Sequence, residues 1–161
     1  MYAFRMQGRK GFSLVELVIV IVIISVIAAI AIPRLTRGAN NAGSAALKAD
    51  LSVLRNAIEL YRAEHEGSFP TVANFTSQLT QYSNLAGDAF GATANVGSGI
   101  VYGPYLKEIP PLPVGTNKGD SGVAAADAAG IGWLYTEANG NIVANLPGTD
   151  TDQDGTAYNT Y

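Results

Sequence analysis

The chain has 161 residues, of which 48% are hydrophobic and 14% are charged. This length is typical of one globular domain, and the hydrophobic fraction excludes a disordered chain. The sequence has no cysteine, which excludes disulfides, thiolate nucleophiles and thiolate metal sites, and its single histidine, His65, disfavours histidine-based metal or triad chemistry.

The charge is divided unevenly along the chain. Residues 1–62 hold eight basic and three acidic side chains, a net charge of +5, whereas residues 63–161 hold two basic and ten acidic ones, a net charge of -8. Nucleic-acid affinity comes mostly from Lys and Arg that neutralise phosphates. The acidic distal part therefore disfavours a nucleic acid as partner.

An uncharged apolar run extends from Leu17 to Ile32, and Phe12–Val15 lies in front of it with one acid, Glu16, between. As a helix this stretch is about 30 Å long, enough to cross the hydrocarbon core of a bilayer. Three basic residues precede it: Arg5, Arg9 and Lys10. By the positive-inside rule the N-terminus stays in the cytoplasm and the rest lies outside. The alternative, a core helix of a soluble protein, is disfavoured because the run is apolar on all faces.

Two ordinary membrane interpretations are open. An exported soluble protein would be cleaved after Ala31, within Ala29-Ile30-Ala31, which would place Pro33 second in the mature chain. A plain permanent anchor has the right length. Neither explains Glu16, because an acid in the hydrocarbon core costs about 2.5–3.5 kcal/mol.

The sequence around that acid, Lys10-Gly11-Phe12-Ser13-Leu14-Val15-Glu16-Leu17, resembles the class III signal of type IV pilins and of type II secretion pseudopilins. The resemblance implies that a prepilin peptidase cleaves after Gly11 and methylates the new amine of Phe12. The apolar helix then stays in the mature protein, first as anchor and later as filament core. Glu16 becomes the fifth mature residue, and the family's use of that acid implies pairing with Phe12 of an adjacent subunit.

Pro33 follows the apolar run. It lacks a backbone N–H and clashes with the carbonyl of Ala29, so a kink or a break is expected there. In the resembled family a proline at this place marks where the helix bends or melts on polymerisation. The alternative is that Pro33 ends the membrane segment and a separate helix follows.

The next segment is an amphipathic helix that Gly67 and Pro70 are expected to stop. One stripe of apolar residues recurs every three or four positions: Leu47, Leu51, Leu54, Ile58 and Tyr61. The stripe is too short for a coiled coil, so we expect it to pack on a small sheet. His65 is expected to be a packing or helix-terminal residue without chemistry.

Two strands are predicted late in the chain, Ile131–Thr136 and Asn141–Asn145, because Asn139-Gly140 between apolar runs favours a hairpin. The residues expected to cover the helix stripe are Trp133, Tyr135, Ile142 and Val143. A third strand is expected from Val101–Leu106 or from 112–116, because two strands alone are marginal.

Between the helix and the hairpin, Thr71 is expected to cap a short helix. Its apolar side would hold Val72, Phe75, Leu79 and Tyr82. Residues 86–99 are rich in Gly and Ala and are predicted to form a long surface loop. The following segment, 103–110, resembles the loop that enters the sheet of the major pseudopilin. After residue 110 the chain departs from the pseudopilin pattern. It also lacks the cysteines with which many type IVa pilins close their C-terminal loop.

The tail contains Asp150, Asp152 and Asp154 in a D-x-D-x-D-G run like the start of an EF-hand calcium loop. Alternate oxygens of such a run can converge on a calcium ion, and Tyr161 holds the twelfth loop position. Calcium binding in this region is common in the resembled major pseudopilins. The alternative is a solvated acidic tail.

Enzyme motifs are missing: the glycines at 97–103 form neither a nucleophile elbow nor a dinucleotide loop, and no P-loop occurs. Asn74-Phe75-Thr76 has the form of a glycosylation acceptor, but this tripeptide is common by chance.

The sequence thus predicts an α+β pilin-like protein in which a long N-terminal helix packs on a small antiparallel sheet. Its expected segments are a leader at 1–11, a membrane-spanning and filament-core helix at 12–33, an amphipathic helix at 34–66 and a globular domain at 67–161. The predicted function is that of a structural subunit of a type IV pilus-like filament, and not of an enzyme. A major pseudopilin of type II secretion is the alternative, and a membrane-anchored periplasmic binding module is the alternative from another class.

The expected partners follow from the resemblance: further copies of the chain, a prepilin peptidase, an inner-membrane assembly platform with its ATPase, and membrane lipid before assembly. No cofactor is required, although a calcium ion is predicted at the tail. The expected location is the bacterial inner membrane, followed by an extracellular pilus or a periplasmic pseudopilus.

Overall fold

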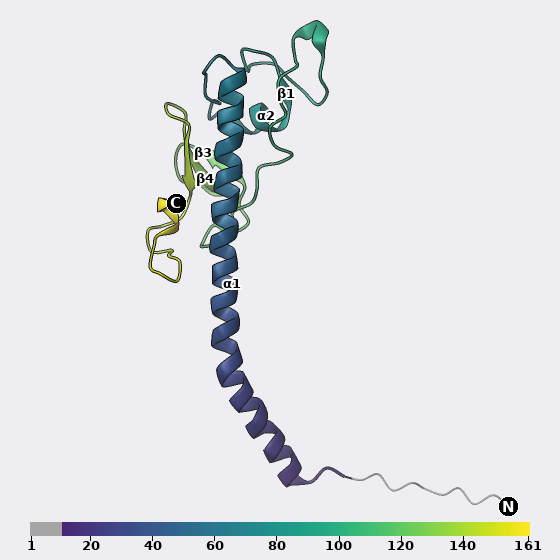
Figure 1. Ribbon diagram of the computed structural model, residues 1–161, viewed down its shortest axis with the longest axis vertical. Coiled ribbons are helices and arrows are strands. Elements are labelled where there is room, and N and C mark those ends of the chain that lie inside the picture. Colours follow the sequence, from purple (N-terminus) through teal and green to yellow (C-terminus); the bar gives the residue numbers. More distant parts are fainter. Residues whose placement is uncertain (1–10) are drawn as a thin grey trace, which may run out of the picture. The chain divides into compact units, whose positions relative to one another are not determined.

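The computed structural model describes residues 11–161, except for the side chains of Pro33, Thr36 and Arg37 (Figure 1). The predicted basic leader residues Arg5, Arg9 and Lys10 lie outside the described residues. The chain divides into two units, Met1–Ala39 and Asn40–Tyr161, and each is described by itself.

Helix α1 is continuous from Leu14 to Glu64. The helix does not stop at Pro33, so the predicted break and the separate second helix are wrong. A proline removes one backbone hydrogen bond of a helix. The hydrogen-bonded turns before and after it can keep the helix continuous despite this loss. The boundary between residues 33 and 34 is therefore a change of composition within one helix, and a kink there stays a prediction.

The end of α1 lies where Gly67 predicted a stop. Glu66 has a φ of 55° and Gly67 a φ of 85°, and this left-handed backbone terminates the helix. The Gly67 N–H donates to the carbonyl of Arg62 at 2.9 Å, which satisfies one of the last helical acceptors.

Short elements make up the rest of the second unit. They are helix α2 (Phe75–Thr80), strands β1 (Tyr82–Ser83) and β2 (Phe90–Gly91), the 3-10 helix η1 (Val96–Ser98), strands β3 (Gly122–Ala124), β4 (Ile131–Thr136) and β5 (Asn141–Ala144), and the 3-10 helix η2 (Tyr158–Thr160).

The predicted hairpin is confirmed. Strands β4 and β5 are antiparallel, with Tyr135 opposite Ile142. Gly140 in the turn has a φ of 70°, a conformation that side-chain-bearing residues rarely adopt.

The third strand is not where the sequence placed it. It is β3, and it runs parallel to β4 in the order β3-β4-β5, so only the hairpin part of the sheet is antiparallel. A strand that runs parallel to its neighbour normally needs a long crossover connection. Strand β3 has only three residues and is about 10 Å long, so the short segment 125–130 is enough to bring the chain back to the start of β4. In Val101–Leu106, one of the two segments predicted to supply the third strand, Tyr102 forms an isolated bridge with Ser83.

Helix α2 begins at Phe75, four residues after the predicted cap. The Thr71 N–H instead donates to Oε1 of Gln78 at 2.7 Å, so Thr71 fastens the turn in front of the helix. The predicted loop at 86–99 contains β2, paired with β1, and the 3-10 helix η1.

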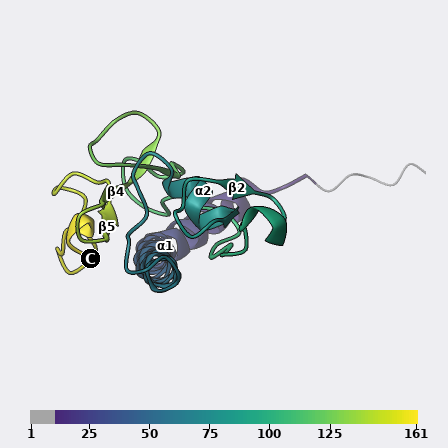
Figure 2. The same cartoon turned by 90° about the horizontal axis from the view of Figure 1, so that it is seen from above.

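The core of the second unit confirms the predicted packing of helix on sheet. All five stripe residues of α1 are buried, together with Trp133, Tyr135 and Ile142. Val143 was predicted among them, but it points to the opposite side of β5 and is only partly buried. Figure 2 shows β4 and β5 on one side of the C-terminal part of α1 and α2 with β2 on another. The α+β class is confirmed.

Candidate functional site

The bond between Gly11 and Phe12, the predicted cleavage point, precedes the first helical residue. Residues 11–13 have no helical structure, and the Phe12 side chain is 79% exposed. A Cβ placed on Gly11 meets no described atom within 4 Å. The described part of the chain thus leaves room for a side chain at Gly11, so a requirement for glycine must come from whatever molecule binds this segment.

Glu16 lies in the first turn of α1, where its carboxylate closes half of a capping box. The backbone N–H of Ser13 donates to Oε2 of Glu16 at 3.3 Å. The Leu17 N–H donates to the carbonyl of Ser13 at 3.2 Å and starts the helical ladder. A carboxylate has about four acceptor positions, so this single bond leaves the exposed Glu16 able to accept from a further donor.

The described apolar side chains of α1 in the first unit are not buried. Leu14–Ile32 are 19 helical residues with a mean hydropathy of 3.2, and none of them is buried. The length matches the hydrocarbon core of a bilayer, and burial against lipid or other helices would remove this apolar surface from water.

Comparison with known proteins bears on this segment. Residues 6–32 match the family model described as the prokaryotic N-terminal methylation motif. No curated protein and no solved structure matches the chain. The chain therefore carries a prokaryotic methylation signal that includes the apolar helical segment, which suggests membrane anchoring. This combination is consistent with the signal of type IV pilin and pseudopilin precursors, which are structural proteins, and it implies processing by a prepilin peptidase.

The predicted calcium residues lie in the loop before η2, and two of the three carboxylates have protein partners. Asp150 Oδ2 accepts from the backbone N–H and the hydroxyl of Thr116, both at 2.8 Å. Asp152 Oδ1 accepts from the backbone N–H groups of Asp154 and Thr156, both at 2.9 Å. Asp152 Oδ2 accepts from the hydroxyl of Tyr161.

This arrangement does not fit a preformed calcium site. Within residues 11–161 as described, no group of three or more acidic or histidine side chains is placed to hold one metal ion. Asp150 is directed to Thr116 and Asp152 to Tyr161, so the two carboxylates serve different segments. Calcium binding by Asp150, Asp152 and Asp154 stays a prediction of the sequence motif.

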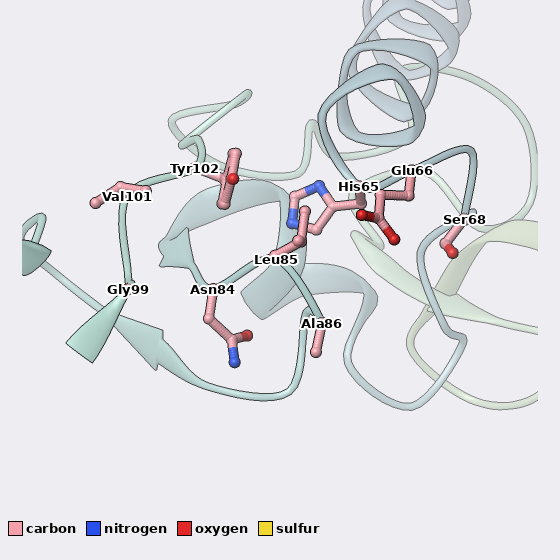
Figure 3. A pocket seen from close by; sticks show the side chains of 9 residues that line it. All are labelled: His65, Glu66, Ser68, Asn84, Leu85, Ala86, Gly99, Val101 and Tyr102. Carbon is pink, nitrogen blue, oxygen red and sulfur yellow. The ribbon is translucent and has the colours of Figure 1, made fainter.

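A hollow of about 590 Å³ lies between the end of α1 and the 84–102 segment (Figure 3). His65 is among its lining residues but is only 2% exposed, and its ring stacks on Tyr61 with centroids 3.7 Å apart. Its Nδ1 donates to the Tyr61 carbonyl at 2.8 Å, and its Nε2 lies 3.1 Å from Oγ of Ser83. Both ring nitrogens therefore have structural partners, as expected for a packing residue.

Sequence reasoning missed a set of contacts between the tail and α1. Lys48 and Arg55 of α1 both meet Tyr161, and Ser44 meets Tyr158. No motif signals such contacts. The sequence offered one indirect indication. Two basic residues lie beside the core stripe, and the tail is rich in tyrosine and aspartate.

Proposed function

We propose that the protein is a structural subunit of a type IV pilus-like filament, made as a precursor and polymerised from the inner membrane. The observation that carries this proposal is the methylation motif at residues 6–32, joined to an apolar helix whose side chains are unburied. The position of the cleavable bond before the helix means that the helix remains in the mature chain.

Glu16 gives the proposal a physical mechanism. In the bilayer its carboxylate is costly, and the bond from the Ser13 N–H offsets only part of this cost because it leaves the charge unpaired. Cleavage after Gly11 creates a new amine on Phe12. Pairing of Glu16 with this amine on a neighbouring subunit compensates the charge, so transfer from lipid to a helix bundle is favoured.

The second candidate is the major pseudopilin of a type II secretion system, supported by the likeness of residues 103–110 to the loop that enters its sheet. Both candidates use the same signal and the same helix. They differ in where the polymer goes: a pilus extends outside the cell, whereas a pseudopilus stays in the periplasm. A membrane-anchored binding module, the candidate from another class, requires no polymer at all.

The test is to isolate sheared surface filaments and periplasmic polymers from cells that express the chain with its own assembly genes. A pilus subunit appears in the sheared surface fraction, and Glu16→Lys removes it from there while the protein still inserts into the membrane. Polymer confined to the periplasm supports the pseudopilin. Absence of polymer from both fractions, with wild-type protein in the membrane, contradicts the proposal.

A further inference from the structure

The tail of the chain packs on α1 through three contacts. The Lys48 ammonium lies 4.4 Å from the centre of the Tyr161 ring. Arg55 Nη2 donates to the backbone oxygen of Tyr161 at 2.6 Å, and the hydroxyls of Ser44 and Tyr158 are 3.2 Å apart. A cation over an aromatic face and a charge-assisted hydrogen bond are both stronger than ordinary surface contacts. From Ser44 to Arg55 the contacts span about three turns of the helix.

The same arginine also binds the sheet. Arg55 Nη2 donates at 3.1 Å to the carbonyl of Ile142, which belongs to β5. In the described sheet β5 is an edge strand, since the order is β3-β4-β5. Edge strands expose unpaired backbone groups to which another chain can add, and proteins usually protect them. Arg55 thus joins the helix, the sheet edge and the tail.

Inside the tail, Asp152 keeps the segment folded. Its carboxylate accepts from the N–H groups of Asp154 and Thr156 and from the Tyr161 hydroxyl. The Asp152 N–H in turn donates to the Thr156 carbonyl at 2.9 Å. The Tyr161 ring also meets Tyr158 edge-on, with centroids 5.7 Å apart.

We propose that residues 150–161 form a metal-independent clasp that fastens the outer edge of β5 to α1, with Arg55 as the shared donor and the Asp152–Tyr161 hydrogen bond as its internal closure. In this role Asp152 acts through bonds to protein donors and needs no calcium ion. The clasp performs the task of closing the tail that a disulfide would perform in a chain with cysteines. Its opening leaves the β5 edge uncovered.

The test uses the full chain in detergent, in a chelator and in millimolar calcium. Trp133 is the single tryptophan and is buried, so its fluorescence reports unfolding of the core. Tyr161→Phe removes only the hydroxyl that binds Asp152, and Asp152→Asn removes the charge and replaces one of the two accepting oxygens by an NH2 group. In chelator each variant lowers the unfolding midpoint by about 2–4 °C, the shift for one lost hydrogen bond in a chain of this size. Chymotrypsin also cleaves at Tyr158 several-fold faster.

Two matched controls separate the clasp from a calcium site. Asp154→Asn removes the same charge from the same loop, and Tyr82→Phe removes a hydroxyl from the half-buried Tyr82 of β1. The clasp predicts wild-type midpoints and cleavage rates for both controls, with or without calcium. Wild-type behaviour of Tyr161→Phe and Asp152→Asn in chelator overturns the proposal. A calcium-dependent rise in the wild-type midpoint that Asp152→Asn and Asp154→Asn both abolish also overturns it, in favour of a calcium site.

Discussion

The backbone N–H of Ser13 lies 3.3 Å from Oε2 of Glu16, to which it donates a hydrogen bond at the start of α1. Glu16 therefore has a role within its own chain besides the role proposed between subunits. The carboxylate caps an N-terminus where a negative charge is also favoured by the helix dipole. The two roles depend on different properties of the side chain, because capping needs an acceptor and subunit pairing needs a charge.

Glu16→Gln separates these roles. The amide oxygen still accepts from Ser13, so the helix starts normally and the protein inserts, but the charge proposed to pair with Phe12 of a neighbour is gone. We expect no filaments by electron microscopy from membranes that contain normal amounts of the variant. Ser13→Ala keeps the Ser13 N–H bond and is expected to assemble. Normal filaments from Glu16→Gln would show that capping alone is the role of this residue.

The core of the second unit predicts a contrast between two leucines of α1. Leu54 has 0% of its surface exposed, whereas Leu60 is 54% exposed. Leu54→Ala is expected to lower the free energy of unfolding by about 2–5 kcal/mol, because it removes buried methyl groups and leaves a cavity. Leu60→Ala is expected to change it by less than about 0.5 kcal/mol. Urea unfolding followed by Trp133 fluorescence measures both, and equal losses would contradict the packing described.

The Asp152–Tyr161 bond makes stability depend on acid pH. The hydrogen bond from Tyr161, then the backbone N–H of Thr156, holds the pKa of Asp152 below its usual value, with Lys48 adding a smaller effect. A lowered folded pKa stabilises the protein above the ordinary pKa of about 4, and this contribution is lost as the pH falls through the lowered value. The difference in unfolding midpoint between wild type and Asp152→Asn should therefore be full at pH 7 and shrink in stronger acid. A difference independent of pH would argue against this bond.

The same bond acts in the opposite direction at alkaline pH. Hydrogen bonding to Asp152, followed by partial desolvation, raises the pKa of Tyr161 to about 12. A pKa that is higher in the folded than in the unfolded state stabilises the protein at pH values below the ordinary tyrosine pKa of about 10. This contribution is lost as the pH rises through the pKa of the folded state. Burial also raises the pKa values of Tyr61, Tyr105 and Tyr135, so several tyrosines ionise late. Ultraviolet titration should therefore show one late-ionising tyrosine fewer in Tyr161→Phe than in the wild type. An unchanged late-ionising fraction would assign it to another tyrosine.

Local patterns predicted the elements that depend on neighbours in sequence. The stripe from Leu47 to Tyr61 and the hairpin around Gly140 follow from helical periodicity and turn chemistry, and both are confirmed. Strand β3 escaped prediction because Gly122–Ala124 is too short to show a period, and its pairing with β4 is decided by packing elsewhere. The clasp escaped for a similar reason, since Arg55 and Tyr161 are 106 positions apart.

The residues predicted for cleavage and assembly could be singled out because their signal is contiguous, and their roles stay predictions. Gly11, Phe12 and Glu16 lie within the motif at residues 6–32. The residues predicted to bind calcium also form a contiguous pattern, but the pattern specifies only which oxygens are available. Their directions depend on Thr116 and Tyr161, which lie outside it.

A prepilin-type filament subunit is defined by how its N-terminus is processed, so the decisive measurement is the intact mass and N-terminal sequence of the protein from cells with and without a prepilin peptidase. We expect a chain that begins at methylated Phe12 only when the peptidase is present, and an uncut chain in its absence. A chain that begins at Ile32, or one that keeps Met1 in both strains, would contradict it and leave an exported or merely tethered domain.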